Sequence, residues 1–289
     1  MRSAEESKRC DDAPENSAVG LPLANDAVDA PEISSALLQR RLLQTRRCLQ
    51  VALALAFCGT ALIFLLWYTG GGCALARHGR RRDATELRIS YMLCCPSIYV
   101  VGVVGYGGGA LLALVALALH DREVSAAATA ALGRTCSGCC WRTTRDGRCF
   151  CSLSAGATAL AFAYVALVGL ALLAVFPVRP CSQRMAPGRG WPHALGSLLF
   201  FFSGDGLLGT LLFACDDEGA YGFVRGAVAF KVASLVALVA SLAAAFAGAP
   251  GLASQGLAVL TIWLAALAFE RELARGGEVL REKQPIGDV

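Results

Sequence analysis

Charged residues are scarce in this sequence, and those present are unevenly distributed. Of the 289 residues, 17% are charged and 56% are hydrophobic, whereas a soluble domain has about 25% charged and about 45–50% apolar residues. The charges gather near the N-terminus, in connecting segments and near the C-terminus, and long stretches between them carry almost none. This distribution argues against a soluble protein and indicates an integral membrane protein with several membrane spans.

Asparagine and histidine are also rare. Asn16 and Asn25 are the only asparagines, and neither begins an Asn-x-Ser/Thr sequon, which excludes N-glycosylation. The three histidines, His78, His120 and His193, lie at span ends or in connecting segments, so they cannot provide a haem site inside a helical bundle. The soluble segments contain neither a phosphate-binding glycine loop nor a nucleophile elbow. We therefore expect no enzymatic activity and no cofactor.

The long apolar stretches predict the fold class. A helix needs about 20 residues to cross the ~30 Å hydrocarbon layer, and hydrocarbon offers an irregular backbone no hydrogen-bond partners. The sequence therefore predicts an all-α protein, a membrane bundle of six transmembrane helices over residues 51–68, 98–119, 153–178, 194–215, 226–248 and 252–269.

The segments outside the spans differ in charge. Residues 1–32 are polar and acidic, which predicts a disordered tail, and residues 33–50 predict a basic amphipathic helix at the membrane surface. Residues 270–289 form a C-terminal tail. With the N-terminus in the cytoplasm, 17 arginines and lysines fall inside and 8 outside, which predicts that both termini are cytoplasmic. The basic residues flank apolar spans, so we expect the lipid bilayer, and no nucleic acid, as their partner; which membrane this is, the sequence does not indicate.

Two charges interrupt the predicted spans, Asp205 in the fourth and Lys231 in the fifth. A charge near the middle of the membrane costs roughly 2.5–3.5 kcal/mol and is usually paired or functional. The two spans are antiparallel neighbours, so Asp205 and Lys231 could form a salt bridge that fixes helix register. The alternatives are a transport or proton-relay site and two independent residues that face water.

The surroundings of Asp205 resemble part of the Gly-x-Gly-Asp motif of intramembrane aspartyl proteases. Phe202 stands where that motif has its first glycine, and no second aspartate lies within a predicted span. Because that chemistry needs two carboxylates that share a proton, the sequence does not support proteolysis.

Residues 104–107 read Val-Gly-Tyr-Gly and resemble the core of a potassium-channel filter. Such a filter binds ions through the backbone carbonyls of a re-entrant loop. Here the motif lies inside an apolar run, and Val103 replaces the usual threonine. Close helix packing through Gly105 and Gly109, a small-xxx-small pair, is the simpler interpretation.

Several of the 13 cysteines lie on the predicted cytoplasmic side. Cys48, Cys149 and Cys151 adjoin spans and are candidates for S-palmitoylation. Cys136, Cys139, Cys149 and Cys151 could form a four-thiolate zinc site. Unmodified thiols are the third alternative, because cytosolic thiols stay reduced.

Another group of cysteines lies on the opposite predicted side. Cys73 could form a disulfide with Cys94, Cys95 or Cys181. A bond from Cys73 to Cys94 or Cys95 would tie together the segment between the first two spans.

Most of this chain is explained by the physics of the bilayer. We expect a non-enzymatic multi-pass membrane protein with a scaffold, trafficking or envelope-type role, acting through helix packing and contacts with lipid or other membrane proteins. The alternative is a small solute or ion transporter or channel that uses Asp205 and Lys231. Replacing Asp205 with Asn separates the two, because a transporter would lose activity at normal abundance.

Overall fold

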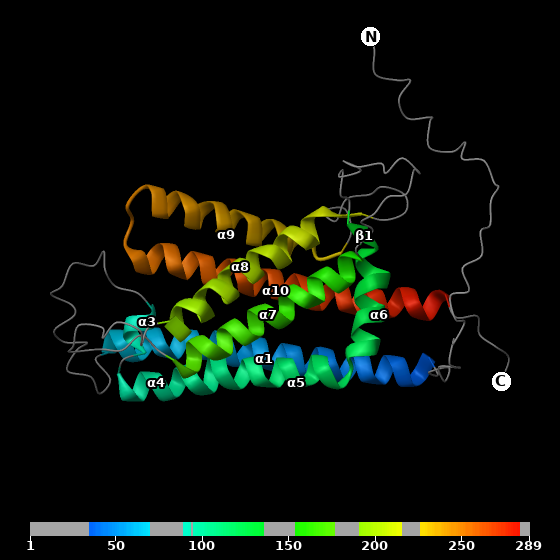
Figure 1. The fold of residues 1–289 in the computed structure, drawn as a ribbon, viewed down its shortest axis with the longest axis horizontal. Helices are drawn as coiled ribbons and strands as arrows, with labels where there is room; N and C mark the ends of the chain where they lie inside the picture. Colours follow the sequence, from blue (N-terminus) through cyan, green and yellow to red (C-terminus); the bar gives the residue numbers. More distant parts are fainter. Residues whose placement is uncertain are drawn as a thin grey trace, which may run out of the picture. The chain divides into compact units, whose positions relative to one another are not determined.

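The computed structural model describes residues 35–69, 89–93, 95–135, 154–176, 191–215 and 226–283. Nearly all of these residues are helical, and six helices are long and apolar enough to cross a membrane. This confirms the predicted all-α fold with six candidate transmembrane helices (Figure 1).

The six spans comprise eight helical segments: α1 (Ser35–Thr69), α4 (Pro96–Gly102) with η3 (Val103–Gly108) and α5 (Gly109–Leu119), α7 (Ala155–Val175), α8 (Trp191–Phe213), α9 (Val228–Phe246) and α10 (Gly251–Lys283). The shorter elements are α3 (Ile89–Met92), α6 (Asp121–Leu132) and the two-residue strands β1 (Arg134–Thr135) and β2 (Ala214–Cys215). The two strands pair antiparallel, so the end of α6 lies beside the end of α8.

Two helices run farther than the apolar stretches that predicted them. α1 begins at Ser35, so the predicted surface helix and the first span form one continuous helix. α10 has 33 residues and continues through the predicted C-terminal tail as far as Lys283. Its length of about 50 Å exceeds the ~30 Å hydrocarbon layer. The start of α1 and the last turns of α10 lie at the same end of the bundle (Figure 1).

At that end of the bundle, α6 lies across the long helices (Figure 1). Its buried face includes Ala127 and Ala128, and glycines let two neighbouring helices approach it closely. A Cβ at Gly276 of α10 would overlap the carbonyl group of Ala127, and one at Gly156 of α7 would overlap the backbone of Ala128. Only glycine fits at these two crossings, so α6 is held firmly against α7 and α10.

Glycines also set the packing of α1 against the second span. A Cβ on Gly105 would lie 3.0 Å from the Cα of Gly59, and a Cβ on Gly109 would lie 2.9 Å from the carbonyl oxygen of Ala52. The predicted packing role of Gly105 and Gly109 is confirmed. Residues 104–107 lie within the helical segment η3, so they do not form the extended loop of an ion filter.

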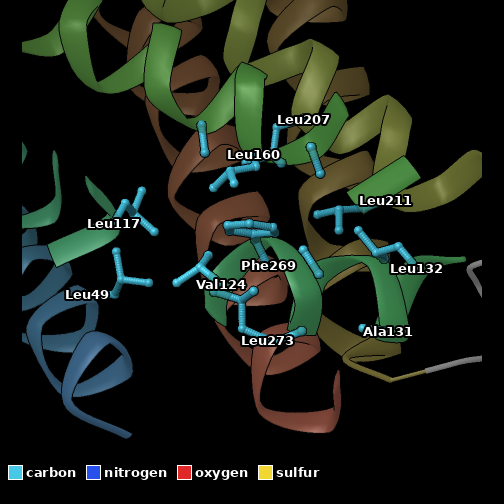
Figure 2. Packing of buried hydrophobic residues seen from close by; sticks show 14 of the residues in the cluster. Leu49, Leu117, Val124, Ala131, Leu132, Leu160, Leu207, Leu211, Phe269 and Leu273 are labelled. Atoms are coloured by element: carbon cyan, nitrogen blue, oxygen red, sulfur yellow. The ribbon is translucent and has the colours of Figure 1, made fainter. Parts of the chain in front are cut away.

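Two large apolar clusters fill the bundle. Figure 2 shows the one nearer α6, where Leu49, Leu117, Leu160, Leu211 and Phe269 come together from five different helices. The other surrounds Trp263 of α10. The aromatic rings nearest to Trp263 are those of Phe57, Tyr106 and Phe200, with centroids 6.0–6.5 Å away.

Candidate functional site: buried charges and cavities of the bundle

Three carboxylates are buried at the end of the bundle where α1 begins and α10 ends, which we call the ionic end. Glu123 of α6, Glu270 and Glu272 of α10 are 3%, 1% and 0% exposed. Taking a carboxylate out of water is expensive unless a cation and further hydrogen bonds compensate it. The structure supplies a cation to each of the three.

Glu272 binds the intramembrane lysine. Nζ of Lys231 lies 2.6 Å from Oε1 of Glu272, and both side chains are completely buried. Nη1 of Arg275 lies 3.5 Å from the other carboxylate oxygen. The ion pair joins the first turn of α9 to the C-terminal half of α10.

The predicted pairing of Lys231 with Asp205 is therefore wrong. Glu272 was assigned to a tail after the last span, but α10 continues as a helix and carries Glu272 back alongside α9. The position of the hairpin turn near Pro250 could have predicted that Glu272 lies close to Lys231. In an antiparallel helical hairpin centred there, Lys231 lies opposite about residue 269, within one helical turn of Glu272.

Glu270 joins α10 to α1. Its Oε1 accepts hydrogen bonds from Nε of Arg46 at 2.8 Å and from Nε2 of Gln50 at 2.9 Å. Nε of Arg271 lies 3.5 Å from its Oε2. Arg46 belongs to the basic run that was expected to contact lipid, so this arginine has a partner inside the protein.

Glu123 joins α6 to α1. Nη1 of Arg41 donates a hydrogen bond to its Oε1 at 2.5 Å. Burial raises the pKa of Glu123, but the hydrogen bond and positive charge of Arg41 outweigh burial, so the pKa lies below its ordinary value. Together the ion pairs fasten α1, α6, α9 and α10 to one another.

Asp205 has a different environment from these acids. It lies on an exposed face of α8, eight residues before Phe213, and the structure shows it no hydrogen bond or ion pair with any described residue. At ~1.5 Å per residue it is about 12 Å from that end of the helix. In a bilayer this carboxylate faces lipid or another protein, and it does not face Lys231.

Two small cavities lie inside the bundle. One of about 70 Å³ is surrounded by α1, α5, α7, α8 and α10 and is lined almost entirely by aliphatic and aromatic side chains. One of about 50 Å³ includes His193, Ser197 and Gln255 in its lining. The two cavities share Leu170, Phe200 and Trp263. Neither is lined by Asp, Glu, Lys or Arg, so neither gives an ion a charged pathway.

The structure describes few of the predicted cysteine sites. Cys48 and Cys58 carry free thiols, and Cys95 is fully buried and disulfide-bonded to a cysteine whose side chain lies outside the described part. The remaining candidates fall outside the described residues: Cys73, Cys94, Cys136, Cys139, Cys149, Cys151 and Cys181. Within the described ranges, no group of three or more His, Cys, Asp or Glu side chains could hold a metal ion. Lipidation, zinc binding and the pairing of Cys73 remain predictions.

No protein-family model, curated protein or solved structure matches this chain.

Proposed function

We propose that this chain is a non-enzymatic multi-pass membrane protein that acts as a scaffold in membrane assembly or trafficking, through helix packing and contacts with lipid and other membrane proteins. The proposal rests on one observation. Lys231 and Asp205, the two charges within the predicted apolar spans, do not line a common cavity inside the bundle. Lys231 is sealed against Glu272, whereas Asp205 faces outward. Transporters place their charged groups along a cavity or pathway inside the bundle.

The packing of the bundle supports a fixed structure. Removing one partner of the fully buried Lys231–Glu272 pair costs about 3–5 kcal/mol, and ion pairs of three buried carboxylates tie four helices together at the ionic end. Glycine contacts hold α6 against α7 and α10 so closely that these helices cannot slide without losing them. A scaffold benefits from such a fixed arrangement, while alternating access requires one half of a bundle to move against the other.

The proposal is tested by measuring flux through the reconstituted full chain. Wild type and Asp205→Asn are placed in sealed phosphatidylcholine vesicles, and proton and potassium movements are followed with a pH-sensitive and a potential-sensitive dye. We expect no flux above that of protein-free vesicles. A protein-dependent flux that Asp205→Asn abolishes would overturn the proposal in favour of the transporter alternative.

A second measurement tests the scaffold role directly. In a mild-detergent extract of native membranes, the chain should migrate in an assembly larger than a 30.2 kDa monomer in its micelle. Migration as a monomer under these conditions contradicts a scaffold that works by protein contacts.

A further inference from the structure

Asp205 belongs to a stripe along α8 that no other described helix covers. Leu198, Phe202 and Phe213 of this stripe are 63%, 69% and 64% exposed. Leu198, Phe202, Asp205, Gly209 and Phe213 follow one another at intervals of three or four residues, which places all five on one face of the helix. Exposed apolar residues are ordinary on a lipid-facing helix, and the carboxylate among them is the anomaly.

The depth of Asp205 makes this anomaly costly. Lys and Arg can extend a long stem to the interface, but the short side chain of Asp cannot bridge about 12 Å. Acidic residues inside membrane segments are rare and usually pair with another group or line a wet cavity. Asp205 lines neither described cavity and has no partner among the described residues. The described part of the bundle therefore gives this carboxylate no ion-pair or hydrogen-bond partner, and a residue of another protein can supply one.

The surface beside Asp205 is shaped for close approach of a helix. Gly209 lies one turn farther along the same stripe, and a Cβ built there would meet nothing within 4 Å. Small residues at such positions let two transmembrane backbones approach closely, and interhelical hydrogen bonds then add to the packing. Phe202, on the other side of Asp205, adds a large apolar contact.

We propose that the face of α8 formed by Phe202, Asp205 and Gly209 binds a transmembrane helix of another protein that carries a Lys or Arg at the depth of Asp205. The proposal rests on the scaffold function and specifies the chemistry of the partner. The cation neutralises the carboxylate, and the open surface at Gly209 admits the partner backbone.

A second copy of this chain is a less suitable partner for this face of α8. Two copies that met through this face would bring two Asp205 carboxylates together, and like charges at one site disfavour each other. Lys231, the cation within the spans, is fully buried against Glu272 in each copy. The described arginines with known partners, Arg41, Arg46, Arg271 and Arg275, lie at the ionic end.

The test uses a synthetic leucine-rich transmembrane peptide with one lysine at the depth of Asp205 and a matched peptide with leucine there. Energy transfer between labelled peptide and labelled full-length chain in phosphatidylcholine vesicles reports association. We expect the lysine peptide to bind about tenfold more tightly than the leucine peptide. Asp205→Leu should abolish this preference, and Leu198→Ala, on the same stripe, should keep it.

The variants also control for folding and for the identity of the partner. Because Asp205 makes no contact with described residues that a leucine would break, Asp205→Leu should keep the wild-type unfolding midpoint. Equal binding of the two peptides, or a lysine preference that survives Asp205→Leu, overturns the proposal. Energy transfer between two labelled copies of the chain that Asp205→Leu abolishes also overturns it, in favour of self-association. If the chain carries flux across vesicles and the two peptides bind equally, both the scaffold function and the binding of a cationic helix are contradicted. If the chain carries flux but still prefers the lysine peptide, only the scaffold function is contradicted.

Discussion

The two ends of the bundle are held together by different interactions. At the ionic end, ion pairs of the buried carboxylates Glu123, Glu270 and Glu272 connect α1 to α6, α1 to α10, and α9 to α10. At the opposite end, neutral hydrogen bonds predominate in the described residues, such as the 2.9 Å bonds from the Ile89 N–H to Gln255 and between Tyr106 and Thr60. Losing a neutral bond costs about 1 kcal/mol, whereas an orphaned buried charge costs several times more. The ionic end should therefore dominate the response to mutation.

The largest effect is expected from Glu272→Leu. This variant removes the Glu272 carboxylate that lies 2.6 Å from the fully buried Lys231, so the free energy of unfolding should fall by about 3–5 kcal/mol. The measurement is equilibrium unfolding in mixed micelles of detergent and denaturing detergent. Glu278→Leu, an exposed glutamate on the same helix, is the matched control and should change stability little. Equal effects of the two variants would contradict the importance of the buried pair.

A smaller loss is expected from Gly276→Ala. The new methyl group would overlap the carbonyl of Ala127 and push α10 away from α6, at a cost of roughly 1–3 kcal/mol. Gly256→Ala on the same helix is the control, because a Cβ there meets nothing within 4 Å. Its better helix propensity should raise stability by about 1 kcal/mol. Unfolding midpoints of the two variants should therefore shift in opposite directions, and a shared direction would refute the close crossing.

At the opposite end, Tyr106→Phe should cost about 1 kcal/mol. It removes the hydroxyl that lies 2.9 Å from Oγ1 of Thr60 but keeps the ring beside Trp263. The same micelle unfolding assay measures the loss. A loss as large as that of Glu272→Leu would show that the contrast between the two ends is wrong.

The smallest effect concerns pH and Glu123. Since the folded pKa of Glu123 lies below its ordinary value of 4.5, its ion pair stabilises the protein above that pH. This contribution is lost as the pH falls through the folded pKa. Because Arg41 is partly exposed, the contribution is about 1 kcal/mol or less. Between about pH 6 and about pH 3, a range that brackets the ordinary carboxylate pKa of about 4, wild type should lose slightly more stability than Glu123→Gln. A parallel decline of the two proteins would contradict the stabilising role of the Glu123 ion pair.

The sequence predicts the parts of this fold that depend on local composition. Six spans follow from the lengths of apolar runs, and the packing role of Gly105 and Gly109 follows from their spacing on one helix face. The partner of Lys231 does not follow from local composition. It depends on how far α10 continues beyond its apolar part and on the register of the hairpin formed by α9 and α10. The outward position of Asp205 likewise depends on which face of α8 the other helices cover. The ion pair and the hydrogen bond between α1 and α10 join residues more than 200 positions apart, and a single sequence contains no pattern that specifies them.

The two charges within the apolar spans act separately, because Lys231 pairs with Glu272 inside the bundle and Asp205 lies on its outer face. Double-mutant cycles measure this directly, with unfolding free energies for Lys231→Met combined with Glu272→Leu and for Lys231→Met combined with Asp205→Leu. The first pair should show a coupling energy of at least about 2 kcal/mol, and the second a coupling within about 0.5 kcal/mol of zero. A strong coupling between Lys231 and Asp205, or none between Lys231 and Glu272, would show that the two charges do not act separately.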